Sequence, residues 1–164
     1  MRHPIDLSVY LVLDPDLCGG AQGMIETTRA AVQNGATCVQ LRAPHWKKRA
    51  LVECGRALKS VLADFNVPLI INDHADVCLA VGAEGLHVGQ DDLSPLDARA
   101  IIGNEKILGL SVSNTQELSA VDIRLVDHLG IGPIFSTSTK PDASAALGLN
   151  GFASLASRKP CPVV

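Results

Sequence analysis

Polar side chains that could bind a ligand or take part in catalysis follow directly where short apolar runs of the sequence end. The runs finish in Asp14, in Gln40 and Arg42, in Asn72 and Asp73, in Gln90, Asp91 and Asp92, and in Ser111. In parallel α/β folds the carboxyl ends of the strands meet at one edge, and active sites collect there. A purely structural rim does not require this convergence. The pattern therefore predicts one polar pocket.

Two of these residues, Asp73 and Asp92, are candidate metal ligands because they end successive runs. Their carboxylates suit Mg²⁺, a hard cation that takes oxygen ligands and is shared with phosphates. For either residue alone, capping of the following helix is an equally good interpretation. The pair favours metal binding, whereas Asp91 and Asp76 are expected to be caps or first-turn charges.

A loop of hydroxyl residues and one ammonium is the candidate anion site. It is formed by Thr137, Ser138, Thr139 and Lys140, which follow Gly132-Pro133-Ile134-Phe135 in a loop after a strand. Backbone N–H groups, hydroxyls and an ammonium in one short stretch suit a phosphate or diphosphate. An ordinary Ser/Thr turn is the alternative. Arg42, which arrives from a different strand, favours the anion site.

The histidines give weaker signals. His87 lies inside an apolar run, where a core histidine satisfied by hydrogen bonds is commoner than a catalytic base. His45 and His74 follow strands in loops and could touch a substrate. No arrangement typical of a Ser-His-Asp or Cys-His nucleophile is compelling.

The elements that must position these residues alternate along the chain. Strands are predicted at 9–14, 38–42, 68–73, 85–89, 106–112 and 128–132, and helices at 24–34, 47–65, 75–81, 96–102 and 115–121. This order predicts parallel strands joined by right-handed crossovers. Units of about 20 residues favour a TIM-type (β/α)₈ barrel over an open sheet.

The last residues, 160–164, read as the opening of a further buried strand. With the six runs this gives about seven strands, whereas a closed barrel needs eight. We therefore expect residues 1–164 to be a single (β/α) barrel domain truncated within the seventh strand, with one to two C-terminal βα units missing.

Composition bounds the class of protein. The chain has 164 residues, 47% of them hydrophobic and 19% charged, which suits one globular domain. A net charge of −3 and only 3% aromatic residues argue against nucleic-acid or membrane partners. Five scattered cysteines without a CxxC pair indicate reduced thiols. We expect a cytoplasmic protein, and composition does not decide between a monomer and a homo-oligomer.

Four motifs occur together between Tyr10 and Gly151: Gln40-Leu41-Arg42, Ile71-Asn72-Asp73, the segment 85–93 with sequence GLHVGQDDL, and the segment 132–140 with sequence GPIFSTSTK. Each is weak alone, but jointly they are specific. In these motifs the chain resembles the thiamin phosphate synthases.

The resemblance implies a (β/α)₈ barrel enzyme, a transferase that couples hydroxymethylpyrimidine diphosphate with thiazole phosphate and releases diphosphate. It implies that Asp73 and Asp92 bind Mg²⁺. It further implies pyrimidine diphosphate contacts from Gln40, Arg42, Asn72, Ser111 and Lys140, and thiazole phosphate contacts from Thr137, Ser138 and Thr139. The family chemistry is dissociative, so charge on the departing diphosphate must be stabilised. Arg42, Ser111 and Lys140 are the candidate catalytic residues for that task.

The chain departs from the family pattern in two places. Pro44 stands where the pattern usually has a lysine, and Lys47 or Lys48 is the candidate substitute. The family's glycine-rich segment after the seventh strand and its eighth-strand loop, which both contact thiazole phosphate, fall beyond Val164. Two alternatives follow: a relative that acts as a thiazole tautomerase without coupling, and a non-catalytic ligand-binding paralogue.

Overall fold

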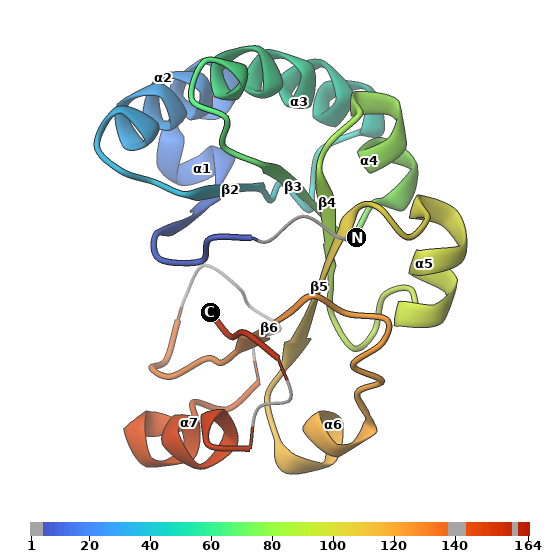
Figure 1. Ribbon diagram of the computed structural model, residues 1–164. Coiled ribbons are helices and arrows are strands. Elements are labelled where there is room, and N and C mark those ends of the chain that lie inside the picture. Colours follow the sequence, from blue (N-terminus) through green and yellow to red (C-terminus); the bar gives the residue numbers. More distant parts are fainter. Residues whose placement is uncertain (1–4, 138–143, 159–160) are drawn as a thin grey trace.

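The computed structural model describes residues 5–137, 144–158 and 161–164, and over these residues short parallel strands form one curled sheet (Figure 1). Its strands are β1 (Tyr10–Leu13), β2 (Cys38–Leu41), β3 (Leu69–Asn72), β4 (Gly85–Val88), β5 (Ile107–Val112) and β6 (His128–Ile131). The spatial order is β1-β2-β3-β4-β5-β6, and each strand pairs in parallel with the next. Each of the six predicted runs contains one of these strands, so the α/β prediction is confirmed.

Helices connect the strands and surround the sheet (Figure 1). They are α1 (Pro15–Cys18), α2 (Gly20–Gln33), α3 (Lys48–Ala63), α4 (Ala75–Val81), α5 (Pro95–Ile102), α6 (Thr115–Ala120) and α7 (Gly148–Ala156). The short α1 was not predicted from the sequence, although the sequence contains residues typical of a helix start. Asp14 caps it by accepting from the backbone N–H of Asp16 and Leu17, and Pro15 occupies its first turn. No helix among the described residues is long and apolar enough to cross a membrane.

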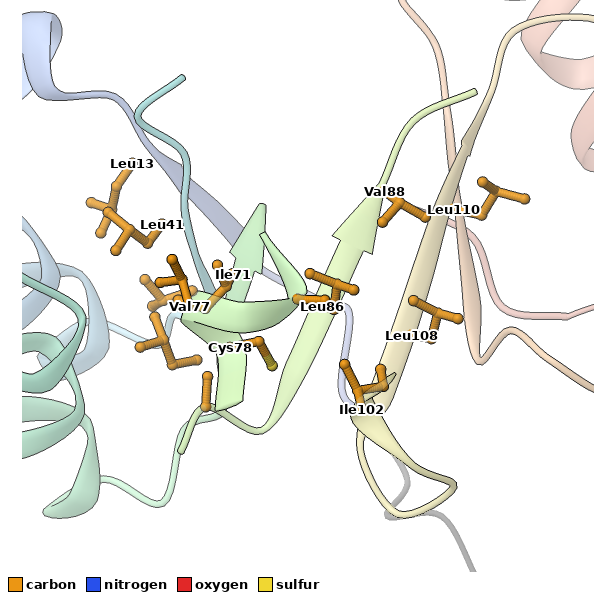
Figure 2. Packing of buried hydrophobic residues seen from close by; sticks show 14 of the residues in the cluster. Leu13, Leu41, Ile71, Val77, Cys78, Leu86, Val88, Ile102, Leu108 and Leu110 are labelled. Atoms are coloured by element: carbon orange, nitrogen blue, oxygen red, sulfur yellow. The ribbon is translucent and has the colours of Figure 1, made fainter. Parts of the chain in front are cut away.

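Strand side chains alternate between two buried layers because successive residues of a strand point to opposite faces. The larger layer lies between the sheet and the helices, where Leu41, Ile71 and Leu86 pack with Val77 and Cys78 of α4 (Figure 2). A smaller cluster, formed by Cys38, Ile70 and Ile107 with Tyr10 and Ile5 packed against it, occupies the other face. Burial on both faces explains why these strands read as continuous apolar runs.

Residues 161–164 run beside β6. Leu129 and Val163 form a parallel bridge, and the Leu129 N–H donates to the Pro162 carbonyl at 2.9 Å. The Ile131 N–H donates to the Val164 carbonyl at 3.0 Å. The strand predicted at 160–164 therefore begins to pair where expected, while Pro160 lies outside the described residues. Over the described ranges the fold is an open, curled half-barrel.

A buried ion pair ties α5 to the beginnings of β5 and β6. Arg99 donates to the carbonyls of Leu125 at 2.7 Å and Lys106 at 2.6 Å, and its Nη2 lies 2.5 Å from Asp127 Oδ2. The same carboxylate oxygen accepts from the Leu108 N–H at 2.8 Å. The side chains of Arg99 and Asp127 are only 4% and 12% exposed. Because both charges are removed from water, each depends on the other.

We expect Arg99→Leu to lower the free energy of unfolding by about 3–5 kcal/mol, because it leaves the Asp127 carboxylate buried without its cation. Urea denaturation measures the change. The matched control is Arg124→Leu, which breaks the exposed pair between Arg124 and Asp122 and should cost about 1 kcal/mol or less. Equal effects of the two substitutions would contradict this prediction.

Candidate active site

A polar cavity of about 740 Å³ opens at the carboxyl ends of the strands. It gathers eight of the nine polar residues predicted from the strand ends: Asp14, Arg42, Asn72, Asp73, Gln90, Asp91, Asp92 and Ser111. They come from the ends of β1 to β5 or from the loops that follow, which is the convergence that parallel strands impose. The prediction of a polar pocket from strand ends is confirmed.

Asp73 takes an unusual backbone conformation at the mouth of this cavity. Its φ is 62°, in the left-handed region that few residues other than glycine adopt. The Asn72 amide donates to its Oδ2 at 2.6 Å, and the Asp73 N–H donates to the His87 carbonyl at 2.8 Å. The N-cap position of α4 is His74, the residue after Asp73. The carboxylate is held against the cavity by its neighbour.

Asp92 also lines the cavity without capping a helix. Its Oδ2 accepts from the Gly89 N–H at 2.8 Å, which closes the loop after β4. The N-cap of α5 is Ser94, which accepts from the Asp97 N–H at 3.1 Å. The N-cap positions of α4 and α5 are thus His74 and Ser94, and neither Asp73 nor Asp92 occupies one.

The donor set fits a magnesium ion. The described residues contain no group of three or more His, Cys, Asp or Glu side chains at metal spacing. Mg²⁺ characteristically binds through one or two carboxylates, keeps several waters and completes its shell with substrate phosphates. Asp73 and Asp92, which both line the cavity, supply that number of carboxylates.

Ser111 and His87 face each other on the wall of the cavity. Ser111 Oγ lies 2.9 Å from His87 Nε2, and both residues line the cavity. His87 is 8% exposed. Sequence reasoning ranked His87 low because its run is apolar, yet the alternation of β4 turns this side chain away from the helices. The alternation of side chains along a strand, in which every second residue points to the same face, is the sequence signal that indicates this placement of His87.

Gln40 lies beneath the cavity and does not line it. Its side chain is 5% exposed and its Nε2 donates to the Tyr10 hydroxyl at 2.9 Å. Burial raises the pKa of Tyr10, so the phenol stays protonated. Tyr10 was missed because the pairing of β1 with β2, which places it near Gln40, depends on register.

The loop after β2 supplies Arg42, Pro44, His45 and Trp46 to the cavity. Lys48 points elsewhere, because its ammonium lies 2.5 Å from the Asp76 carboxylate on the outer surface of α3 and α4. That contact lowers the pKa of Asp76, and Asp76 stands in the first turn of α4, as predicted. Neither Lys47 nor Lys48 lines the cavity, whereas His45 does.

A second cavity, of about 440 Å³, adjoins the first beside β5 and β6. Thr137 and Ser144 line it, and Ser144 Oγ donates to Ser113 Oγ at 3.1 Å. Ser113 is itself fixed by Glu117, whose Oε2 accepts from the Ser113 N–H at 2.7 Å. The other predicted loop residues, Ser138, Thr139 and Lys140, lie outside the described residues.

Below both cavities, His128 is completely buried on the inner face of the sheet. Its ring centroid lies 5.5 Å from that of His87 and 5.8 Å from that of Tyr10. Within the part of the chain that the structure describes, neither ring nitrogen of His128 has a hydrogen-bond partner. Burial lowers the pKa of His128 to about 4, so the ring is neutral near pH 7.

Comparison with known proteins gives a consistent answer. The family model described as thiamine monophosphate synthase matches residues 9–164. The thiamine-phosphate synthase of Azorhizobium caulinodans is 53% identical over 164 residues, which are 100% of this chain and 77% of that protein. That of Xanthobacter autotrophicus is 54% identical over 148 residues, 90% of this chain and 70% of the relative.

A solved structure agrees with these relatives. The thiamine phosphate pyrophosphorylase from Pyrococcus furiosus superposes with a TM-score of 0.81 at 27% sequence identity. The match covers 94% of this chain and 72% of that chain.

The neutral His128 generates a prediction on acid stability. Its pKa in the folded state lies below the usual 6.5, so the unfolded state binds more protons as the pH falls from 6.5 towards 4. Stability is therefore complete above pH 6.5 and is lost below it, by up to about 1.4 kcal/mol per pH unit. Between about pH 7 and about pH 5, urea denaturation should show a loss near 2 kcal/mol from this group.

The control for this titration is His128→Phe, which keeps a planar ring without the proton site. This variant should lose about 2 kcal/mol less than the original chain over the same pH interval. Identical pH dependence of the two proteins would show that His128 is not the titrating group.

Proposed function

The chain belongs to the thiamine monophosphate synthase family, and from that membership we propose that it couples hydroxymethylpyrimidine diphosphate with thiazole phosphate to form thiamine phosphate and diphosphate. The observation that carries the proposal is the single cavity that gathers Arg42, Asn72, Asp73, Asp92 and Ser111. A cation and amide and hydroxyl donors suit a diphosphate, and two carboxylates suit the metal that accompanies it.

The chemical step needs stabilisation of a leaving group. The bond between the pyrimidine methylene carbon and the diphosphate oxygen breaks, and its electron pair leaves with the diphosphate. The thiazole nitrogen then attacks the methylene cation. Arg42 donates to the oxygens on which charge develops, so its hydrogen bonds strengthen towards the transition state. Asn72 and Ser111 line the same cavity and are further donors, and His87 orients the Ser111 hydroxyl. Lys140 is a further candidate cation.

Magnesium is the proposed metal, held by Asp73 and Asp92. When bound, it supplies positive charge against the diphosphate. The Asn72 amide and the Gly89 N–H each donate to one of these carboxylates, and these bonds would fix the orientation of the two side chains that would bind the ion.

The second cavity is the proposed thiazole phosphate site. Thr137 lines it, and Ser138, Thr139 and Lys140 follow directly in sequence. Gln40 stays a predicted pyrimidine diphosphate contact, and its Nε2 also donates to the Tyr10 hydroxyl. We place the coupling in the cytoplasm, with small molecules as the partners.

A complete (β/α)₈ barrel is the proposed architecture of the enzyme. Support comes from the sequential parallel strand order and from the parallel pairing of Val163 beside β6. The chain also spans 77% of the Azorhizobium relative and 72% of the Pyrococcus structure, which leaves length in those proteins for further strands.

The coupling activity is tested by measuring thiamine phosphate formation and diphosphate release by the purified protein. Both products should form only when both substrates and Mg²⁺ are present. Chelation by EDTA should abolish turnover, and added Mg²⁺ should restore it. Binding of thiazole phosphate without any affinity for the pyrimidine diphosphate would favour the tautomerase alternative, and binding of both without turnover would favour a non-catalytic paralogue.

The metal assignment is tested by Asp92→Ala, which removes one of the two proposed ligands. We expect the turnover rate to fall by about a hundredfold or more and the Mg²⁺ requirement to rise. Asp76→Ala is the matched control, because Asp76 pairs with Lys48 outside the cavity and its loss should leave turnover within about twofold. Unchanged Mg²⁺ dependence in Asp92→Ala would remove Asp92 from the metal site.

A further inference from the structure

The two cavities of the candidate active site share one wall. Gly89, Gln90, Asp91 and Ser111 line both of them. If each cavity holds one substrate, as the proposed function requires, the carbon and nitrogen that become bonded must meet at this wall. Bond formation needs the reacting atoms about 3–3.5 Å apart and aligned. The shared wall is therefore the part of the site whose position matters most to coupling.

Gln90 attaches the loop after β4 to β5 at this wall. Its Nε2 donates to the Ser111 carbonyl at 2.6 Å, which bridges 21 positions of sequence. Ser111 is thus held twice, by His87 through its hydroxyl and by Gln90 through its carbonyl. The loop is closed on its own side by the bond between the Gly89 N–H and Asp92. The Gln90 amide thus connects this loop to β5 by a side-chain hydrogen bond.

The contact requires a neutral donor of this length. A glutamate at this position would set a carboxylate against the Ser111 carbonyl oxygen, beside Asp91 and Asp92, and so replace an attraction with repulsion. An asparagine keeps the amide but shortens its reach by one methylene. Alanine removes the bond without adding charge. These three substitutions separate the effects of donor, charge and length.

We propose that Gln90 is a positioning residue that fixes the junction of the two cavities, so that the methylene cation is captured by the thiazole nitrogen and not by water. This inference rests on the proposed function. With the junction loosened, the diphosphate still leaves with its electron pair. A water oxygen then bonds to the methylene carbon and releases a proton to solvent, which gives hydroxymethylpyrimidine. Diphosphate release and thiamine phosphate formation cease to be equal.

The experiment measures both products in Gln90→Ala. We expect kcat for thiamine phosphate to fall about 10–100-fold, since a displacement of about 1 Å in a site costs a rate factor of that order. KM for each substrate should change less than about threefold, because each cavity keeps its own ligands. The ratio of diphosphate released to thiamine phosphate formed should rise above that of the original protein.

Variants and a control make this test specific. Gln90→Glu should be at least as impaired as Gln90→Ala, and Gln90→Asn should recover part of the coupling ratio. The matched control is Gln22→Ala, which removes an exposed glutamine of α2 that donates to Glu26 at 2.8 Å and should leave kcat and the product ratio unchanged. Circular dichroism checks that each variant folds. If Gln90→Ala does not fold, the ratio in Gln90→Asn decides.

The possible failures are distinguishable. An unaltered kcat and product ratio in Gln90→Ala, with an active original protein, overturn the inference alone. A rise of both KM values with an unchanged ratio also overturns it, since Gln90 would then support binding and not the junction. An original protein that makes no thiamine phosphate overturns the proposed function and this inference together.

Discussion

Between β4 and β6, the inner face of the sheet has room for two imidazole rings because β5 carries Gly109 at the level where they meet. A methyl group at Gly109 would lie 2.3 Å from a ring atom of His87 and 2.4 Å from His128. Register sets this meeting, since His87 pairs with Gly109 and Gly109 with His128. In this arrangement His87 Nε2 lies within hydrogen-bond distance of Ser111 Oγ. This hydrogen bond holds two side chains of the cavity wall in place.

The two ends of the strands carry different kinds of interaction. At their amino ends, charged side chains form ion pairs with one another: Arg99 pairs with Asp127, and Lys59 pairs with Glu84. The other carboxylate oxygen of Glu84 accepts from the Leu69 N–H at 2.9 Å. At the carboxyl ends, carboxylates such as Asp92 are instead turned towards a cavity. This division is the one expected of barrel enzymes, in which the amino face serves stability and the carboxyl face serves chemistry.

The sequence predicted the strands and the gathering of Arg42, Asn72, Asp73 and Asp92, because alternation and parallel topology fix which residues end each strand. Other features depend on information that a linear pattern lacks. The Gln40 contact with Tyr10 needs the register of β1 against β2, and the diversion of Lys48 to Asp76 needs the packing of α3 on α4. The roles of Ser138, Thr139 and Lys140 stay predictions from motif alone.

The left-handed backbone at Asp73 is a position where the residue best for backbone stability differs from the residue that can supply a carboxylate. This conformation costs most L-residues roughly 1–2 kcal/mol, and Asp is among the few that adopt it more readily. Asp73 adopts it with a φ of 62°. Glycine would relax the backbone but would remove the carboxylate from the cavity. Backbone freedom and the proposed metal binding therefore favour different residues at this position, and this chain carries the one that keeps the carboxylate.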